Sequence, residues 1–311
     1  MAEHTPPQHS QSDRDVALQR FSVFGVLKRA AFQFMEDRAF ILGGALAFYT
    51  SLSLGPLVMI LLWVGGSADV GVQQGFVDEI RGLIGEGGGS IMEIIIANAR
   101  EQPELGNVSA VISVLVLILS ATAAFAHLQT TMNIVWNVRR SAGREIRGWF
   151  WKRLVSLIMI GLVGVLVLAS LGVSTVIAFL ASWSPEALPG ARLVWAAADA
   201  VVTTSTFTLL FATVFKFLPD VEIDWRDVWV GALTTAAFLW VGKGLIGLYL
   251  GQSSVGSAYG AAGSLVIFLV WVYYCAILVF FGAEITQVWA RSQGRRIRPS
   301  GKAEFVVSNG S

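Results

Sequence analysis

The sequence predicts an all-α, polytopic membrane protein built as a bundle of six membrane-spanning helices. Two observations support this: six long apolar segments divide the chain, and nearly all Lys and Arg residues lie in alternate connections between them. About 20 helical residues cross the roughly 30 Å hydrocarbon core of a bilayer, and each segment reaches that length. Apolar residues make up 55% of the chain and charged residues 14%, too few polar side chains to cover a soluble protein. The expected spans cover residues 39–66, 108–128, 154–183, 194–217, 228–250 and 262–290.

The distribution of positive charge predicts the orientation of the bundle. Basic residues gather before the first expected span, between the second and third, between the fourth and fifth, and after the sixth. The other connections hold only Arg81, Arg100 and Arg192. Cytoplasmic connections of membrane proteins carry an excess of Lys and Arg. We therefore expect a multi-pass protein with both termini in the cytoplasm.

The segments outside the expected membrane domain, residues 39–290, are of three kinds. Residues 1–15 are polar and expected to be disordered. Residues 16–38 repeat apolar side chains at helical spacing and predict an amphipathic helix on the cytoplasmic side. This helix either lies in the membrane interface with its basic side toward anionic headgroups or packs against the ends of the spans. Residues 291–311 are expected to form a basic cytoplasmic tail.

The connection between the first two spans, residues 67–107, is long and unusually apolar. Two apolar stripes, at 76–84 and 91–96, flank a glycine-rich break at 85–89. We expect two short amphipathic helices at the outer side of the bundle, joined by a glycine hinge. Such a segment fits either a moving lid over a transport path or a fixed cap.

Polar residues inside the spans are the candidate functional residues, because burying them in lipid is costly. In the fourth span, Asp199, Thr203 and Thr206 fall at helical spacing on one face, which should point into the bundle. Lys243 of the fifth span is expected at nearly the same depth as Asp199, so the two are candidates for an ion pair in the outer leaflet. In the alternative, Lys243 extends to the outer headgroups and Asp199 touches water at its helix end.

Three further polar residues lie in other spans. Tyr49 precedes Gly55-Pro56, where the missing backbone donor should kink the first span and leave a carbonyl available. Asn133 lies near the cytoplasmic end of the second span, and Glu284 near that of the sixth. An inner-leaflet carboxylate such as Glu284 either relays protons or holds a cation, or it pairs with a neighbouring Arg.

No pattern of catalytic, cofactor-binding or metal-binding residues stands out. Cys275 is the only cysteine, which excludes an intramolecular disulfide and a Cys-based zinc site. Of the three histidines, His4 and His9 lie in the polar tail and His127 stands alone. The chain has no glycine-rich nucleotide loop. We therefore predict no enzyme activity, no cofactor, no nucleic-acid partner and no transport driven by ATP on this chain.

Several short motifs resemble a known family over residues 21–291. They are Gly43-Gly44-Ala45-Leu46-Ala47-Phe48-Tyr49 with Gly55-Pro56, Asn133-Ile134-Val135-Trp136-Asn137-Val138, Lys216-Phe217-Leu218-Pro219, Gly242-Lys243-Gly244 before Gly247-Leu248-Tyr249, and Gly263-Ser264 before Gly282-Ala283-Glu284. In this order they are similar to the YihY/BrkB family of bacterial inner-membrane proteins. The resemblance implies a six-span helical protein of the inner membrane. Members of that family have been labelled ribonuclease BN-like, serum-resistance factors, and exporters of lipids or small solutes.

One departure from the family pattern concerns the connection after the fourth span. A basic residue usually follows Pro219-Asp220, whereas this chain has Glu222, Asp224 and Asp227. These carboxylates argue against attraction of anions to this loop.

The polar residues favour a transporter, exporter or lipid translocator over a nuclease, because no metal ligands or acid/base pair face water. Lys243 toward the outer side favours an anionic or zwitterionic solute or headgroup, with membrane lipids as the expected partners. A non-transporting scaffold or envelope-assembly factor is the alternative. The residues expected along a transport path are Tyr49, Asn133, Asp199, Thr203, Thr206, Lys243 and Glu284.

Overall fold

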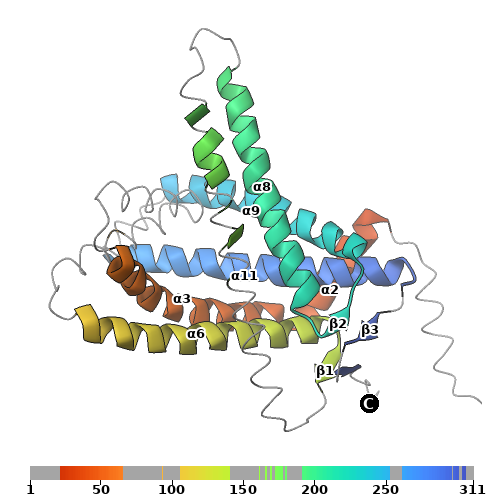
Figure 1. The fold of residues 1–311 in the computed structure, drawn as a ribbon. Coiled ribbons are helices and arrows are strands. Elements are labelled where there is room, and N and C mark those ends of the chain that lie inside the picture. Colours follow the sequence, from red (N-terminus) through yellow and green to blue (C-terminus); the bar gives the residue numbers. More distant parts are fainter. Residues whose placement is uncertain are drawn as a thin grey trace, which may run out of the picture.

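The computed structural model describes the chain in several stretches, most of them helical (Figure 1). The described residues are 22–65, 93, 106–140, 161, 165–166, 169, 172–177, 179–180, 191–252, 261–295, 297–300 and 303–305. The expected disordered tail, the expected outer helices with their glycine hinge, and most of the expected third span lie outside these residues.

Five of the expected spans correspond to long helices. These are α3 (Ala39–Gly65), α6 (Gly106–Val135), α8 (Ala191–Phe217), α9 (Trp225–Gln252) and α11 (Ala261–Ser292). The helix α6 continues past residue 128, where the apolar run was expected to end. It can do so because other elements cover its polar last turns, and Thr131 and Met132 are fully buried. The helix α3 continues through Pro56.

Among the described residues, three helical segments are long and apolar enough to cross a membrane. They are Val114–Val135, Leu193–Phe217 and Phe268–Ser292, and the shorter segment Ala39–Ser53 is also apolar. Many large apolar side chains on these helices face outward, among them Ile112, Leu119 and Val201. Such a surface is costly in water and suits contact with lipid chains. The protein is therefore a mostly helical membrane protein.

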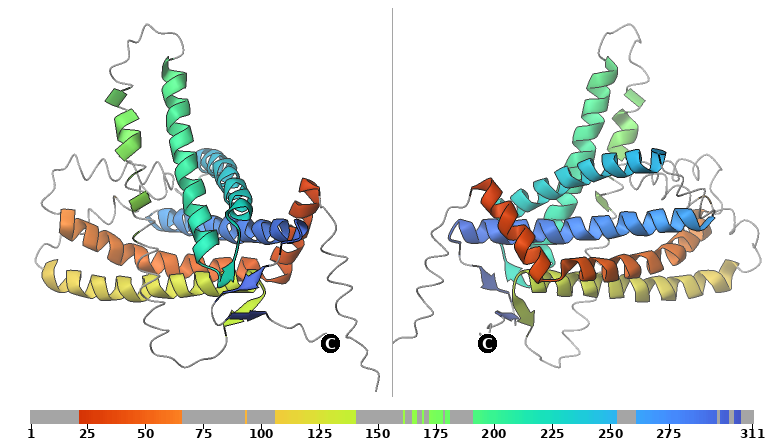
Figure 2. Two further views of the ribbon diagram at one scale, coloured as in Figure 1. Left: turned by 45° about the vertical axis from the view of Figure 1, so that its right-hand side comes forward. Right: turned by 180° about the vertical axis from the view of Figure 1, so that it is seen from behind.

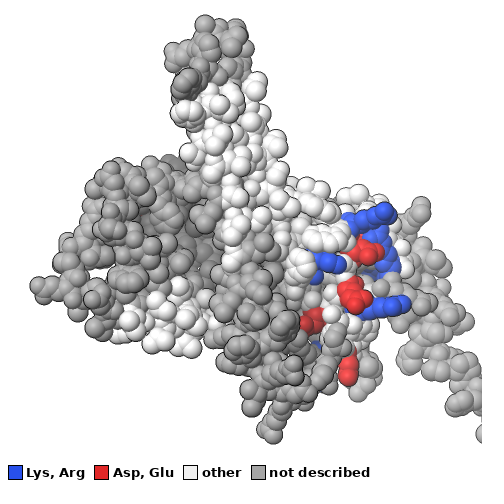
Figure 3. Space-filling view, in the orientation of Figure 1, with Lys and Arg blue, Asp and Glu red and all other residues white. Residues whose placement is uncertain are grey.

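The helices meet at one end of the bundle. The helices α3, α6 and α11 lie side by side, α9 packs against α11, and α8 crosses steeply over α9 (Figures 1 and 2). The starts of α3 and α9 and the ends of α6, α8 and α11 lie together. The charged side chains of the described residues gather there too, as Figure 3 shows, and we call this region the charged end.

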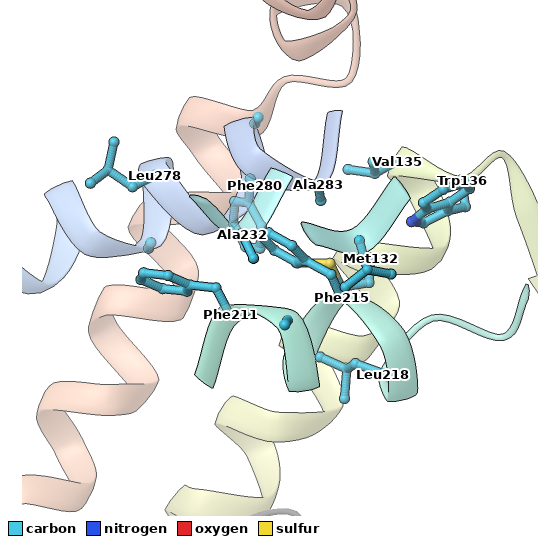
Figure 4. Close-up of a cluster of buried hydrophobic side chains, with 14 of the residues drawn as sticks. Met132, Val135, Trp136, Phe211, Phe215, Leu218, Ala232, Leu278, Phe280 and Ala283 are labelled. Atoms are coloured by element: carbon cyan, nitrogen blue, oxygen red, sulfur yellow. The ribbon is translucent and has the colours of Figure 1, made fainter. Parts of the chain in front are cut away.

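The larger of the two hydrophobic clusters among the described residues brings four helices together (Figure 4). Its fully or nearly fully buried members include Met132, Val135, Trp136, Phe211, Phe215, Leu218, Val228, Ala232, Phe280 and Ala283. Because these side chains come from α6, α8, α9 and α11, they fix the mutual positions of those helices at this end.

Two glycines allow α9 and α11 to approach closely. A Cβ on Gly231 would overlap Thr286, and a Cβ on Gly282 would overlap Thr235 and come within 2.8 Å of the Phe215 ring. The two threonine hydroxyls donate to carbonyls of their own helices, Thr235 to Gly231 at 2.7 Å and Thr286 to Gly282 at 2.8 Å. Small residues at the contact are typical of helices packed in membranes.

The N-terminal helix α2 (Val23–Glu36) is shorter than the expected 16–38, and residues 16–21 lie outside the described part. Ser22 caps its start by accepting a hydrogen bond from the N–H of Gly25 at 3.2 Å. Its buried face, which includes Val26 and Phe34, packs on α11. The helix α2 therefore packs against a long helix on one face, while Phe24 on another face is 77% exposed.

The expected basic tail returns to the charged end and forms two small strand pairs there. The strand β3 (Arg298–Pro299) pairs antiparallel with β2 (Val221–Glu222), which follows α8. The strand β4 (Ala303–Phe305) pairs antiparallel with β1 (Val138–Arg140), which follows α6. The sequence did not predict these strands, because segments of two or three residues are too short to show alternation.

Candidate functional site

The residues expected along a transport path do not converge on one place. Glu284 and Asn133 lie at the charged end, while Asp199 and Thr203 lie in the other half of α8. The side chain of Lys243 is outside the described part, so its pairing with Asp199 stays a prediction. The polar groups form three sites: an acid pair, a pocket at the charged end, and a pocket away from that end, which we call the outer pocket for its distance from the charged end.

The acid pair consists of Glu284 on α11 and Asp37, the C-cap residue of α2. Glu284 is 0% exposed, as expected for a carboxylate turned into the bundle. Among the described residues neither of its oxygens accepts a hydrogen bond from an N–H or hydroxyl group. The carboxyl groups of Glu284 and Asp37 lie within reach of a hydrogen bond, and the positive charge of Arg291 also acts on Glu284. Two carboxyl groups can share a hydrogen bond only if one carries a proton.

The surroundings of the pair disfavour a second negative charge. Burial raises the pKa of Asp37, and the nearby Glu36 raises it further, while the bond to Glu284 and the positive charge of Arg291 lower it. One turn along α11, Gln287 is also fully buried. Its amide nitrogen donates to the carbonyl oxygen of Val135, and its side-chain oxygen meets no donor among the described residues.

Asn133 joins two elements that are far apart in the sequence. Its amide nitrogen donates to the Asp220 carboxylate at 2.8 Å, and its oxygen accepts the Asp220 backbone N–H at 2.8 Å. This two-way bond fixes the end of α6 to the loop after α8. The observed geometry gives Asn133 a structural role, and it shows no free amide facing a path.

Tyr49 lies in α3 beside α6. Its ring centroid is 5.8 Å from that of His127, and the Nε2 atom of His127 lies 2.9 Å from the Leu42 carbonyl oxygen. The histidine that stood alone in the sequence therefore serves as a bridge from α6 to α3. Tyr49 contributes an aromatic contact to the same junction.

The outer pocket lies between α8, α9 and α11 and has a volume of about 210 Å³. Its walls include Asp199 and Thr203 from α8, Trp240 from α9 and Trp271 from α11. The hydroxyl of Ser174, in the expected third span, donates to Asp199 at 2.8 Å. A pocket lined by a carboxylate and two indole side chains suits a positively charged group, because a negative charge and aromatic rings both attract cations.

The other polar residues of α8 do not extend this pocket. Thr206 does not line it, and its hydroxyl donates to the Val202 carbonyl of its own helix at 2.9 Å. Thr208 and Thr213 likewise donate to carbonyls four residues earlier, both at 2.8 Å. The polar face that the sequence showed on α8 is therefore largely satisfied within the helix, apart from Asp199 and Thr203.

The third site is a pocket of about 550 Å³ at the charged end, which sequence reasoning missed. Arg295 of the returning tail forms ion pairs there with Asp227 at 2.8 Å and with Asp224 at 3.5 Å. Lys216 also lines it and donates to the Ile223 carbonyl. The sequence did carry one signal for this site: the loop after Pro219 holds three acids, Glu222, Asp224 and Asp227, and the C-terminal tail is basic.

No group of three or more His, Cys, Asp or Glu side chains among the described residues lies close enough to hold a metal ion.

Comparison with known proteins places this arrangement in a family. Curated relatives called UPF0761 membrane proteins include those of Alkalilimnicola ehrlichii, 30% identical over 278 residues, and of Methylibium petroleiphilum, 29% identical over 279 residues. The matches cover 86% of this chain, and 59% and 63% of those relatives. The chain thus spans less than two thirds of the length of these relatives. No solved structure matches.

The family model for Virulence factor BrkB matches residues 30–305, which include every described helix from α3 to α11 and both strand pairs. The resemblance carried by the short sequence motifs is thereby confirmed. This chain belongs to the Virulence factor BrkB family of membrane proteins.

Proposed function

We propose that the protein is a transporter or lipid translocator of the bacterial inner membrane that moves a zwitterionic solute or lipid headgroup without ATP. The outer pocket is the observation that supports this proposal. Asp199 attracts an ammonium group, and the rings of Trp240 and Trp271 attract it further. The sequence allowed an anionic or a zwitterionic substrate, and the carboxylate in this pocket favours the zwitterionic one.

The proposal includes six spans with the charged end in the cytoplasm. The gathering of the described Lys and Arg side chains at that end supports this orientation. It would put the outer pocket in the outer half of the membrane. Reporter fusions after the C-terminus and at Gly87 test it, and an external C-terminus would refute the six-span arrangement.

Transport is tested with the purified full chain in lipid vesicles. The probes are phosphatidylethanolamine and phosphatidylglycerol labelled on an acyl chain, with an impermeant reductant reporting movement between leaflets, and labelled glycine betaine for uptake. We expect faster movement of at least one zwitterionic probe than in protein-free vesicles, and little effect on phosphatidylglycerol. The Asp199→Asn variant should lose about tenfold in rate, whereas Ser205→Ala on the exposed side of α8 should not.

Movement of phosphatidylglycerol alone would overturn the zwitterionic assignment. Movement of none of the probes would overturn the transport proposal and favour the scaffold alternative.

The predicted pairing of Asp199 with Lys243 sharpens the same experiment. If the two charges are coupled, Lys243→Ala should slow transport about as much as the double change with Asp199→Ala, because removing one partner strands the other. If the effects of the two single changes add independently, Lys243 extends to the outer lipid headgroups and does not pair with Asp199.

A further inference from the structure

The acid pair is the least compensated polar feature of the described structure. Glu284 is completely buried, and no N–H or hydroxyl group among the described residues reaches either of its oxygens. Asp37 is only partly buried, so one member of the pair touches solvent at the charged end. The two carboxyl groups lie within reach of each other, and a hydrogen bond between them requires a proton on one.

Two other side chains of α2 and α11 also carry buried oxygens without a donor among the described residues. Gln287, one turn after Glu284 and fully buried, has a side-chain oxygen without a donor. Gln33, one turn before Asp37 on α2, also has a buried side-chain oxygen without a donor. Four buried side-chain oxygens, on Glu284, Gln287 and Gln33, therefore lack a donor among the described residues. A proton on the pair supplies the missing donor without adding another side chain.

We propose that Asp37 and Glu284 form a proton-binding site that takes up one proton from the charged end and holds α2 against α11. With the proton in place, one carboxyl group donates a hydrogen bond to the other, and α2 stays packed against α11. When the proton leaves to water, two adjacent carboxylates repel each other in a poorly solvated place, and α2 separates from α11. This inference does not require the proposed transport activity.

The charged groups that act on the pair are Glu36 from α2 and Arg291 from α11. Glu36 favours retention of the proton, and Arg291 favours its loss. Proton binding and docking are linked, because the docked form binds the proton more tightly than the separated form. Raising the pH must therefore shift the protein toward the separated form, and lowering it toward the docked form.

The first test is the infrared carbonyl band of a protonated carboxylic acid in the full-length protein in nanodiscs. At about pH 7, far above the ordinary carboxyl pKa of about 4, we expect a band that Glu284→Gln removes. The matched control is Glu36→Gln, an exposed acid next to Asp37, which should keep the band. An identical wild-type and Glu284→Gln spectrum at this pH would overturn the proposal.

The second test measures docking. Spin labels at Met35→Cys on α2 and Gln293→Cys after α11, both exposed positions, report their separation in a Cys275→Ser background. We expect a narrow distance distribution at low pH that broadens at high pH in the wild type. In Glu284→Gln it should stay narrow at every pH, because the amide donates to Asp37 permanently.

Asp37→Asn, in which the new amide donates to Glu284, should likewise remove the pH dependence. A distribution that responds to sodium chloride at constant pH, and not to pH, would identify a metal-cation site and overturn the proton assignment.

Discussion

Between Ala276 and Ala290, α11 is buried on nearly every side, whereas between Val266 and Val270 the same helix turns large apolar side chains outward. In the first stretch Glu284, Thr286 and Gln287 are all 0% exposed; in the second, Val266 is 39% and Val270 53% exposed. Protein atoms surround one half of the helix, whereas the other presents an apolar surface suited to lipid. The charged end is therefore the part of the bundle that specifies how the helices fit together.

The polar contacts show the same contrast. At the charged end they connect different elements, as in the bonds of Asn133 to Asp220 and of Gln287 to Val135. In the other half of α8, Thr204 and Thr206 donate to their own helix. Two bonds in this half of α8 do cross between elements, from Ser174 to Asp199 and from Trp240 of α9 to Thr204, both at 2.8 Å. Rearrangement of the helices should therefore cost more at the charged end than beyond it.

The largest expected effect is that of Gly282→Ala. The added methyl group would overlap Thr235 and Phe215 where α9, α8 and α11 meet, so we expect a loss of about 3 kcal/mol of unfolding free energy, or failure to fold. Thermal unfolding in detergent measures it. The matched control is Gly44→Ala, where the nearest atom is 3.9 Å away in the Tyr273 ring. Equal losses in both variants would contradict the contrast between tight and loose packing.

A smaller loss is expected for Asn133→Ala. It removes both hydrogen bonds to Asp220, each worth about 1 kcal/mol, so the unfolding free energy should fall by about 2 kcal/mol. Thr130→Ala, on the exposed side of the same helix, should change it by less than about 0.5 kcal/mol. Denaturant titration followed by tryptophan fluorescence compares the two. An unaffected Asn133→Ala would show that the strand pairs alone hold this junction.

The pH dependence of stability separates the charged end from the rest of the bundle. Burial raises the pKa of Asp37 in the folded protein above its ordinary value in the unfolded chain. The stability that the protonated Asp37 contributes is therefore fully present below the ordinary pKa and is lost as the pH rises through the raised pKa of the folded state. Over that window the wild type should lose stability, and Asp37→Asn should lose less. Phe32→Ala, an exposed change on the same helix, should keep the wild-type dependence. Unfolding midpoints measured from acid to neutral pH decide between these outcomes.

The smallest effect is expected beyond the buried half of α11. Val270→Ala removes outward-facing methyl groups, so detergent or lipid fills the space and stability should change by less than about 0.5 kcal/mol. By contrast, Val288→Ala, in the buried stretch between α2 and α11, should cost about 1 kcal/mol or more. Similar values for the two in thermal unfolding would mean that the outward face is covered by protein.

The helices were largely predictable from the sequence, because a span needs a long apolar run and the runs at 39–66, 194–217, 228–250 and 262–290 are unmistakable. The continuation of α6 to Val135 was not, since tertiary contacts bury Thr131 and no local pattern reveals that. The close approach of α9 and α11 was also not predictable. The need for glycine at positions 231 and 282 is evident only when the two helices are packed together, because a Cβ there would overlap the other helix.

For the sites, the sequence identified polar residues but not their partners. Asn133 and Glu284 stood out because they are polar in or near apolar runs, yet Asp220 and Asp37 are distant in the chain and lie outside those runs. Arg295 was one of several basic residues in a segment expected only to form a basic tail, so its ion pair with Asp227 could not be foreseen. Long-range pairing of this kind depends on the fold and leaves no periodic signal.

The strand pairs of the returning tail bear on how the protein is made. The residues of β1 and β2 leave the ribosome before α11 exists, whereas their partners β4 and β3 are synthesised after it. Neither pair can therefore form until the last long helix has been delivered for insertion. Their closure would mark the end of biogenesis, and a chain halted earlier would expose the partnerless backbone of β1 and β2 to quality-control proteases.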